Sequence, residues 1–333
     1  MTPVELSRTV LRAVRRAVDE GELSVAVPER VVVERPRPGG CGDYATNVAL
    51  QLAGPARRAP RHVAELLSRR LADSPGIAGV EVTGPGFLNV TLTTDDPGTL
   101  AREILARGKG YGNSDVLAGQ RIELRVPHEV RAEVVADSVS RILATQGADS
   151  YVTHDGDATA TAQVVHLRPV PAPSDPAVLG RDAARWALLL PAAHDRPHLD
   201  DGRHLAQRES NPLFRVRYAY ARTRALTRNA AALGFTAEPG DVRDTTPGET
   251  LATTLAAYPQ ALAAAARHHA PDRLARHLVL VADAFLGFQH TVLPQGEEKP
   301  SAAHRARLAL AEAAGAVLAG GLSLLGIDAP EHL

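Results

Sequence analysis

Hydrophobic positions follow two different patterns along the chain. In the N-terminal third, helical spacing alternates with short β-branched or alternating runs, whereas the C-terminal half has helical spacing almost throughout. Strands are expected in the first part at residues 31–34, 80–82 and 87–92. Helices are expected at residues 2–20, 43–53, 60–71 and 96–108. These elements predict a compact α+β domain.

The middle of the chain reads as strand, helix, strand and strand. The strands are expected at residues 121–126, 150–156 and 162–170, the helix at 128–146, and a proline-rich linker at 169–176. An autonomous doubly wound domain needs on the order of 150 residues. We therefore expect this short α/β segment, a relic of a Rossmann-type domain, to pack against its neighbours.

The C-terminal half predicts a helical bundle of five or six members. Its helices are expected at residues 180–190, 204–209, 211–234, from 246 onward with a kink at Pro259, 271–293 and 301–320. Apolar residues at the 3.6-residue period, such as Leu274, Leu278 and Val281, support the bundle. The predicted fold class is multidomain and mainly α, with domains at residues 1–117, 118–174 and 175–333.

The helix at residues 211–234 contains five arginines and no acid. Asn211 suits the N-cap, Pro212 the first helical position, and Gly234 a left-handed stop. At about 100° per residue, one arc of roughly 60° holds Arg215, Tyr218, Arg222 and Asn229. The opposite side holds Arg217, Arg224 and Arg228. The first arc suits RNA, because guanidinium groups bind phosphates and aromatic rings stack on bases, but a solvated arginine-rich helix has the same pattern.

Composition narrows the classes of function. The aromatic fraction is only 4%, so alanine, leucine and valine must form the core, which favours helices. With a formal net charge of -1, any nucleic-acid site must be a local patch. The single cysteine, Cys41, excludes an internal disulfide and a cysteine-based zinc site, and we interpret it as an ordinary loop residue. No signal peptide and no apolar run of about 18 residues is apparent, so we expect a soluble, cytoplasmic protein.

The histidines do not indicate a metal site. His194 and His198 have a suitable interval, but Pro197 breaks the helix that would align them, and the adjacent His268 and His269 face different ways. We therefore expect no bound metal and no cofactor. A polar turn follows the second strand of the α/β segment, where α/β proteins often bind ligands, so a small-molecule site there is an alternative. This turn contains His154, Asp155 and Asp157.

Several stretches together resemble arginyl-tRNA synthetase. GDYATNVALQLA, PRHVAELL and VEVTGPGFLNV, within residues 42–90, are similar to the N-terminal domain of that family, which meets the D-loop at the tRNA elbow. NPLFRVRYAYAR at 211–222 and the stretches at 273–295 and 305–331 are similar to its helical anticodon-binding domain. Residues 180–201 resemble the helical passage that leads into that domain. These matches cover about two thirds of the chain, in the order of the family.

The catalytic part of the family is not matched. Its class I signature, His-x-Gly-His, binds ATP phosphates, but the aligned positions hold Val126, Pro127, His128 and Glu129. Glu129 would repel a polyphosphate, and the side chain of His128 blocks the close approach that glycine permits. The second, lysine-bearing ATP loop of the family has no counterpart. The resemblance therefore implies a paralogue without aminoacylation activity, an arginyl-tRNA synthetase-related anticodon-binding protein.

The resemblance also implies RNA-binding residues at the tRNA elbow. Phe87 and Asn89 alternate along one strand and so share a face. They correspond to the aromatic and polar pair with which the family touches a D-loop nucleotide. The alternative is that Phe87 is a core residue and Asn89 a polar residue at the strand edge.

A second implied site lies at the anticodon arm. Tyr218 and Arg222 match a stretch of the family that borders the anticodon loop, whereas Arg215 differs from the residue usual there. The C-terminal His332 and Leu333 also depart from the usual ending, which helps to hold anticodon bases. The resemblance therefore does not carry over the specificity for arginine anticodons.

The leading hypothesis is a non-catalytic tRNA-binding protein that grips the elbow and the anticodon arm of one tRNA, such as an arginine tRNA. No DNA and no membrane is expected as a partner. The alternative is a protein-interaction subunit that partners a true synthetase or a tRNA-dependent enzyme, with RNA binding reduced or lost. A third interpretation, a tRNA-dependent transferase with a new active site in the α/β segment, lacks a nucleophile and base pair that we can name.

Overall fold

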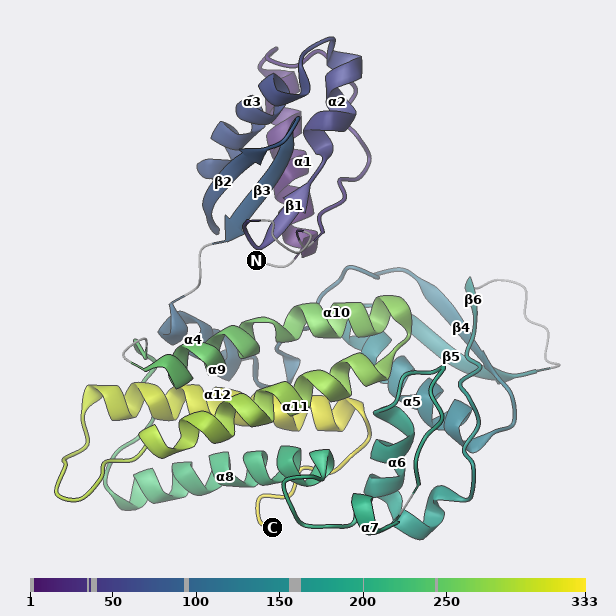
Figure 1. Cartoon of the computed structure of the whole chain (residues 1–333), viewed down its shortest axis with the longest axis vertical. Coiled ribbons are helices and arrows are strands. Elements are labelled where there is room, and N and C mark those ends of the chain that lie inside the picture. The colour runs from purple at the N-terminus through teal and green to yellow at the C-terminus, as the bar shows by residue number, and fades with distance from the viewer. Residues whose placement is uncertain are drawn as a thin grey trace. The chain divides into compact units, whose positions relative to one another are not determined.

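The computed structural model describes residues 3–34, 36, 41–92, 96–155, 163–199, 201–242 and 245–333. Its contacts divide the chain into two compact units, Met1–Asp95 and Asp96–Leu333 (Figure 1). The predicted fold class is confirmed: the protein is mainly helical, with an N-terminal α+β part, a small parallel sheet and a C-terminal helical part. The division into three domains at residues 117 and 174 stays a prediction.

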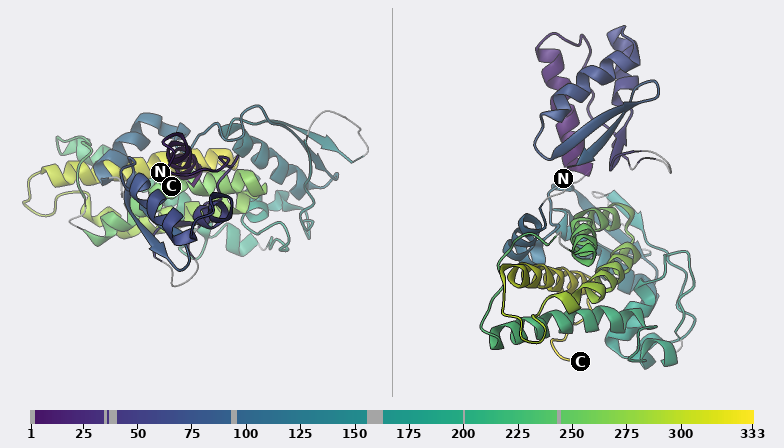
Figure 2. Two further views of the ribbon diagram at one scale, coloured as in Figure 1. Left: turned by 90° about the horizontal axis from the view of Figure 1, so that it is seen from above. Right: turned by 60° about the vertical axis from the view of Figure 1, so that its left-hand side comes forward.

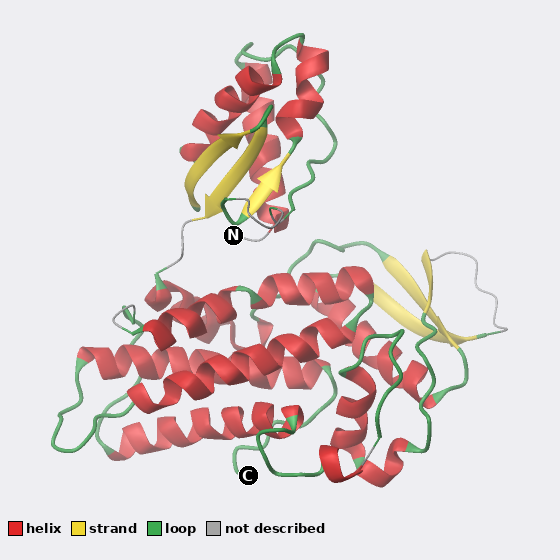
Figure 3. Ribbon diagram, in the orientation of Figure 1, coloured by secondary structure: helices red, strands yellow, loops and turns green. Residues whose placement is uncertain are grey.

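The first unit packs three helices on one face of an antiparallel sheet (Figure 3). The helices are α1 (Pro3–Asp19), α2 (Val48–Ala56) and α3 (Pro60–Ala72). The strands are β1 (Tyr44–Thr46), β2 (Ile77–Thr83) and β3 (Phe87–Leu92), in the order β1-β3-β2. Leu88 and Val90 of the central strand are fully or almost fully buried with the helices, as period-two alternation requires. Their neighbours on β3 therefore point to the opposite face.

Two local predictions for this unit are wrong. Residues 31–34 form only an isolated bridge, from Glu34 to Ala45, instead of a strand. The helix expected from residue 43 begins at Val48, because Tyr44 and Thr46 are taken up by pairing with β3 and are buried against the core. Tertiary pairing here overrides the helical pattern of a short segment.

The predicted α/β segment is confirmed as three parallel strands with one helix in the second unit. The strands are β4 (Arg121–Val126), β5 (Asp149–His154) and β6 (Gln163–His166), in the order β5-β4-β6, and the helix is α5 (Val130–Thr145). Ile122, Leu124 and Val126 of the central strand join one hydrophobic core with the helices of this unit. The segment thus packs against its neighbours, as expected from its small size.

The remaining helices of the second unit include the long α12 (Ala302–Leu324), which packs against α4, α8, α9 and α11. The others are α4 (Pro97–Arg107), α6 (Arg181–Leu189), α7 (Asp201–His204), α8 (Pro212–Ala232), α9 (Thr246–Ala256), α10 (Tyr258–His268) and α11 (Pro271–Phe288). Figure 2 shows α12 in yellow running between the other helices. Although α12 is long and apolar enough to cross a membrane, 72% of its most apolar window is buried, as in a core helix. The sequence predicts this helix at residues 301–320 but not its apolar window of 18 residues.

Several boundaries in this unit differ from expectation, among them β6, which ends at His166 rather than at residue 170, and α12, which runs to Leu324 rather than to residue 320. The short helix expected at 204–209 lies earlier, at Asp201–His204. The kink expected at Pro259 is a break between two helices at Ala257, and Pro259 lies in the first turn of α10, where its missing N–H costs no helical hydrogen bond. Helix α11 ends at Phe288, five residues before the expected end at 293, and continues as a single 3-10 turn.

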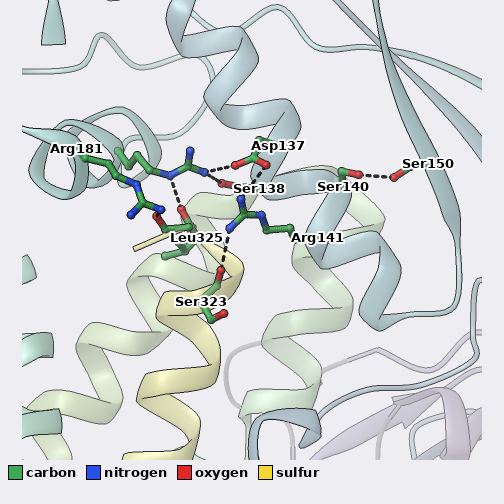
Figure 4. Close-up of polar contacts among 10 residues, drawn as sticks. Asp137, Ser138, Ser140, Arg141, Ser150, Arg181, Ser323 and Leu325 are labelled. Atoms are coloured by element: carbon green, nitrogen blue, oxygen red, sulfur yellow. Dashed lines mark hydrogen bonds and ion pairs between the residues drawn. The ribbon is translucent and has the colours of Figure 1, made fainter. Parts of the chain in front are cut away.

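Three arginines tie the C-terminal end of α12 to the α/β segment and α6 (Figure 4). Arg141 donates to the carbonyl of Ser323 (3.2 Å), Arg185 to that of Leu325 (2.8 Å), and Arg181 to that of Gly326 (3.4 Å). The last carbonyls of a helix lack intrahelical donors and carry partial negative charge, so guanidinium groups stabilise them. Asp137 of α5 accepts from Arg141 and Arg185 and keeps both in place.

We expect the stability of the second unit to fall on acidification between about pH 6.5 and pH 4 because of His277. Burial lowers the pKa of His277 to about 4, and its Nε2 atom has no hydrogen-bond partner among the described residues. The unfolded chain binds a proton below its ordinary pKa near 6.5, and the folded chain does not until about pH 4, so stability is full above pH 6.5 and decreases by about 3 kcal/mol across this window.

Urea denaturation at pH 7.5 and pH 4.5 checks this expectation. The variant His277→Leu should show a smaller loss of unfolding free energy than the wild type, whereas His290→Leu, at an exposed histidine, should match the wild type. An equal loss in all three proteins would contradict the assignment to His277.

Candidate nucleic-acid interface

Helix α8 is fixed at both ends by the residues that the sequence indicated. The Asn211 side chain accepts from the Leu213 backbone N–H (3.1 Å), and its amide donates to the carbonyls of His204 and Ala206 (2.8 and 2.9 Å). At the other end, Gly234 has a φ of 78°, the left-handed conformation that ends helices. The start of α8 is therefore anchored to the preceding loop, which fixes the rotation of its side chains.

The predicted arc of α8 lies along α11. Arg215 pairs with Asp283 of α11 (3.1 Å), and Arg222 donates from Nε to the side-chain oxygen of Gln289 (2.9 Å). Tyr218 and Asn229 are exposed. The Gln289 amide is neutral, so this contact orients the Arg222 guanidinium without neutralising it, whereas Asp283 neutralises Arg215. Arg222 is thus the stronger of the two as an anion-binding group.

Phe214 extends this surface and was missed by the sequence analysis. Its ring stacks on that of Tyr218, with centroids 5.7 Å apart and an interplanar angle of 17°. The i, i+4 spacing of two aromatic residues could have revealed the pair. Phe214 also lines a pocket of about 350 Å³ that extends to the C-terminal Leu333. We name Phe214, Arg215, Tyr218, Arg222 and Asn229 the α8 surface.

The opposite arc of α8 holds the C-terminal tail. Arg217 pairs with Asp182 of α6 and donates to the carbonyl of Asp328 (3.0 Å). Two further arginines contact Glu331, with Arg224 at 3.1 Å and Arg228 at 4.0 Å. No function is predicted for this arc from the sequence, and in the structure its arginines hold the C-terminal tail. His332 and Leu333, which follow Glu331, are exposed.

In the first unit, Phe87 and Asn89 lie on the face of β3 opposite to the buried Leu88 and Val90. Phe87 is 42% exposed, so the alternative that it is a core residue is wrong. Asn89 is only 6% exposed and donates to the Thr83 hydroxyl (2.7 Å). Glu81 of β2 lies opposite Asn89 in the sheet. Its side chain forms a hydrogen bond with the Cys41 thiol, which raises the pKa of that thiol. Phe87 is therefore available to a ligand, whereas Asn89 is largely covered.

Of the four positions that the sequence aligns with the class I signature, Glu129 caps a helix. Val126 ends β4, and Glu129 is the N-cap of α5. The Glu129 carboxylate accepts from the backbone N–H groups of Ala132 (2.9 Å) and Ala172 (3.1 Å). A helix N-terminus that binds phosphate needs free N–H donors, and Glu129 fills this one with a negative charge. His128, next to Pro127, stacks on His154 with ring centroids 4.0 Å apart.

The described residues contain one group of three metal-type ligands, His128, Glu133 and His154. His194 and His198, which the sequence analysis rejected, are not part of such a group. Of the polar turn proposed for a small molecule, Asp155 pairs with Arg168 (3.2 Å), and Asp157 lies outside the described residues.

Two known domain families match the chain. Residues 5–92 match the family described as the arginyl tRNA synthetase N terminal domain, and residues 216–333 match the DALR anticodon binding domain. The first match contains Phe87 and Asn89, and the second contains Tyr218, Arg222 and Asn229, whereas Phe214 and Arg215 lie just before it. The segment of residues 93–215 that holds the parallel sheet belongs to neither match.

Curated relatives include several arginine--tRNA ligases. That of Frankia alni is 45% identical over 157 residues, 44% of this chain and 28% of the ligase, and that of Micrococcus luteus is 38% identical over 240 residues, 65% of this chain and 42% of the ligase. The chain thus spans less than half the length of these relatives. The ligase of Paenarthrobacter aurescens aligns end to end at 25% identity over 550 positions, although this chain has only 333 residues.

A solved structure shares the fold. The arginyl-tRNA synthetase of Thermus thermophilus superposes over the whole of both chains with a TM-score of 0.67 at 14% identity. This likeness shows the shared fold, and the two domain matches show that the chain, shorter than the full synthetases, carries an arginyl tRNA synthetase N terminal domain at residues 5–92 and a DALR anticodon binding domain at residues 216–333.

Proposed function

We propose that this protein binds tRNA and does not aminoacylate it. The observation that carries the proposal is that Glu129, at the position aligned with the ATP signature, caps α5 with its own carboxylate. The two matched domains support tRNA as the ligand, because the DALR domain is an anticodon-binding domain. In this proposal the tRNA elbow contacts Phe87, and the anticodon arm contacts the α8 surface.

The α8 surface supports RNA binding through its mixture of groups. The stacked rings of Phe214 and Tyr218 offer an aromatic face to an unstacked base of a single-stranded loop. Arg222, held by a neutral amide, offers a guanidinium to a phosphate. Arginine tRNA is the first candidate ligand, since the relatives are arginine--tRNA ligases. Other tRNAs should also be tested, because His332 and Leu333 depart from the ending usual in the family.

The lack of catalysis rests on two further observations. The end-to-end alignment with the Paenarthrobacter aurescens ligase runs over 550 positions against 333 residues in this chain, so much of that ligase has no counterpart here. The parallel sheet has only three strands in the described residues, fewer than a doubly wound nucleotide-binding domain uses. We place the protein in the cytoplasm, where tRNA is charged.

We expect no ATP–pyrophosphate exchange with arginine, with or without tRNA. The physical reason is that Glu129 removes the phosphate site at α5 and adds a like charge to it. The Micrococcus luteus ligase, assayed under the same conditions, is the positive control. Arginine-dependent exchange above the blank by the purified chain would overturn the non-catalytic part of the proposal.

A protein-interaction subunit is the second candidate. It is favoured by the two outer strands of the parallel sheet, where Val152 of β5 and Val164 of β6 are 42% and 39% exposed. Exposed apolar residues on edge strands suit a protein partner. RNase treatment of material copurified from the native host discriminates the two: the partner remains under this candidate and is lost under tRNA binding.

A further inference from the structure

Two histidines and a glutamate meet where two parallel strands end. His128 follows β4, His154 is the last residue of β5, and Glu133 lies in the first turn of α5. Their ligand atoms all lie within 4.8 Å of one another. The carboxyl ends of neighbouring parallel strands are a common place for ligand sites, because the loops there converge.

The distances within this group are close to those that a bound metal ion requires. The rings of His128 and His154 are nearly parallel, at 9°, and the Nε2 atom of His154 lies 3.4 Å from the Glu133 carboxylate. A zinc ion bound at about 2.0–2.1 Å from each ligand requires nitrogen atoms roughly 3.3 Å apart. His128 and Glu133 are exposed, so rotation of their side chains can turn the ligand atoms toward one ion.

The charged groups around the site do not compete with a cation. The neighbouring Arg168 is held by both oxygens of Asp155 (3.2 Å each). The Glu129 carboxylate is engaged with backbone N–H groups, so Glu133 is the acid that remains for an ion. Two imidazole nitrogens and one carboxylate oxygen are donors that divalent transition metals favour.

We propose that His128, Glu133 and His154 bind one divalent transition-metal ion, such as Zn²⁺, with water in the remaining coordination positions. None of these three residues belongs to the proposed tRNA contacts. It occupies the segment in which the sequence departs from the class I signature, so that His128 gains a role there as a ligand.

The test is a titration of the tag-free, full-length chain with Zn²⁺ by calorimetry, with stoichiometry from equilibrium dialysis. One ion per chain should bind, and His128→Ala or His154→Ala should each lower the affinity at least about 10-fold. Glu133→Gln should lower it less, since the amide oxygen is a weaker ligand. The double variant His194→Ala/His198→Ala is the matched control and should bind as the wild type does.

Co²⁺ binding gives a second readout. In the wild type, the visible absorption should have the intensity of a four- or five-coordinate site, and His154→Ala should lose it. Circular dichroism verifies that the variants fold. Undiminished affinity and stoichiometry in His128→Ala/His154→Ala, or the absence of stoichiometric binding to the wild type, would overturn the proposal.

Discussion

Replacing Phe87 by alanine and Arg222 by glutamate in the same chain should weaken tRNA binding by roughly 100-fold. Loss of base stacking at Phe87 is expected to cost about 1–3 kcal/mol, and charge reversal at Arg222 removes a phosphate contact and adds repulsion. The two residues lie in different units and share no partner, so their effects should add in free energy. Filter binding measures the affinity of each variant for tRNA. Each single variant should bind about 10-fold more weakly than the wild type, and the double variant roughly 100-fold more weakly.

The matched control for Arg222 is Arg228→Glu on the same helix. Arg228 belongs to the opposite arc, which contacts the tail through Glu331. The two variants have the same net charge and change different faces of α8. Equal weakening by Arg222→Glu and Arg228→Glu would contradict the α8 surface and would indicate general attraction to a positive helix.

Replacing Arg131 by alanine should destabilise the second unit by about 4 kcal/mol or more. Arg131 is fully buried, and its guanidinium donates to five backbone carbonyls, those of Val170, Leu188, Pro191, Ala192 and Asp195. The variant leaves these carbonyls without their donors and creates a cavity, and each such change costs about 1–3 kcal/mol. Urea denaturation followed by circular dichroism measures the loss.

Arg141→Ala is the control on the same helix. Arg141 is partly exposed and contacts Asp137 and the carbonyl of Ser323, so its loss should cost less than about 1 kcal/mol. Similar destabilisation by both variants would contradict the role assigned to Arg131. Glu129 and Arg131 lie together at the start of α5, and both bind backbone groups of residues 170–172.

Long periodic segments were predictable from the sequence, and short ones were not. The limits of α8 follow from Asn211, Pro212 and Gly234, each of which acts on its own neighbours. Strand β1 has only three residues, and its strand geometry depends on pairing with β3, more than 40 residues later. Local pattern contains no information about that partner, so the segment was assigned to a helix.

The sequence predicts which residues of the candidate site share a face of a strand or helix, but not which partners they contact. Alternation places Phe87 and Asn89 together, and helical rotation separates the two arcs of α8. The hydrogen bond that covers Asn89, the neutral partner of Arg222 and the tail held by Arg224 depend on tertiary packing. The same reason explains why the cluster of His128 and His154 was missed, since parallel pairing brings two distant strand ends together.

The central claim is that the intact chain binds tRNA through phosphate and base contacts. The most direct test is a filter-binding titration of the tag-free protein with bulk tRNA at about 50 and 200 mM salt. We expect saturable binding at the lower concentration and at least about a 10-fold loss of affinity at the higher one, because phosphate contacts release counterions. No retention of tRNA at 50 mM salt would contradict the claim.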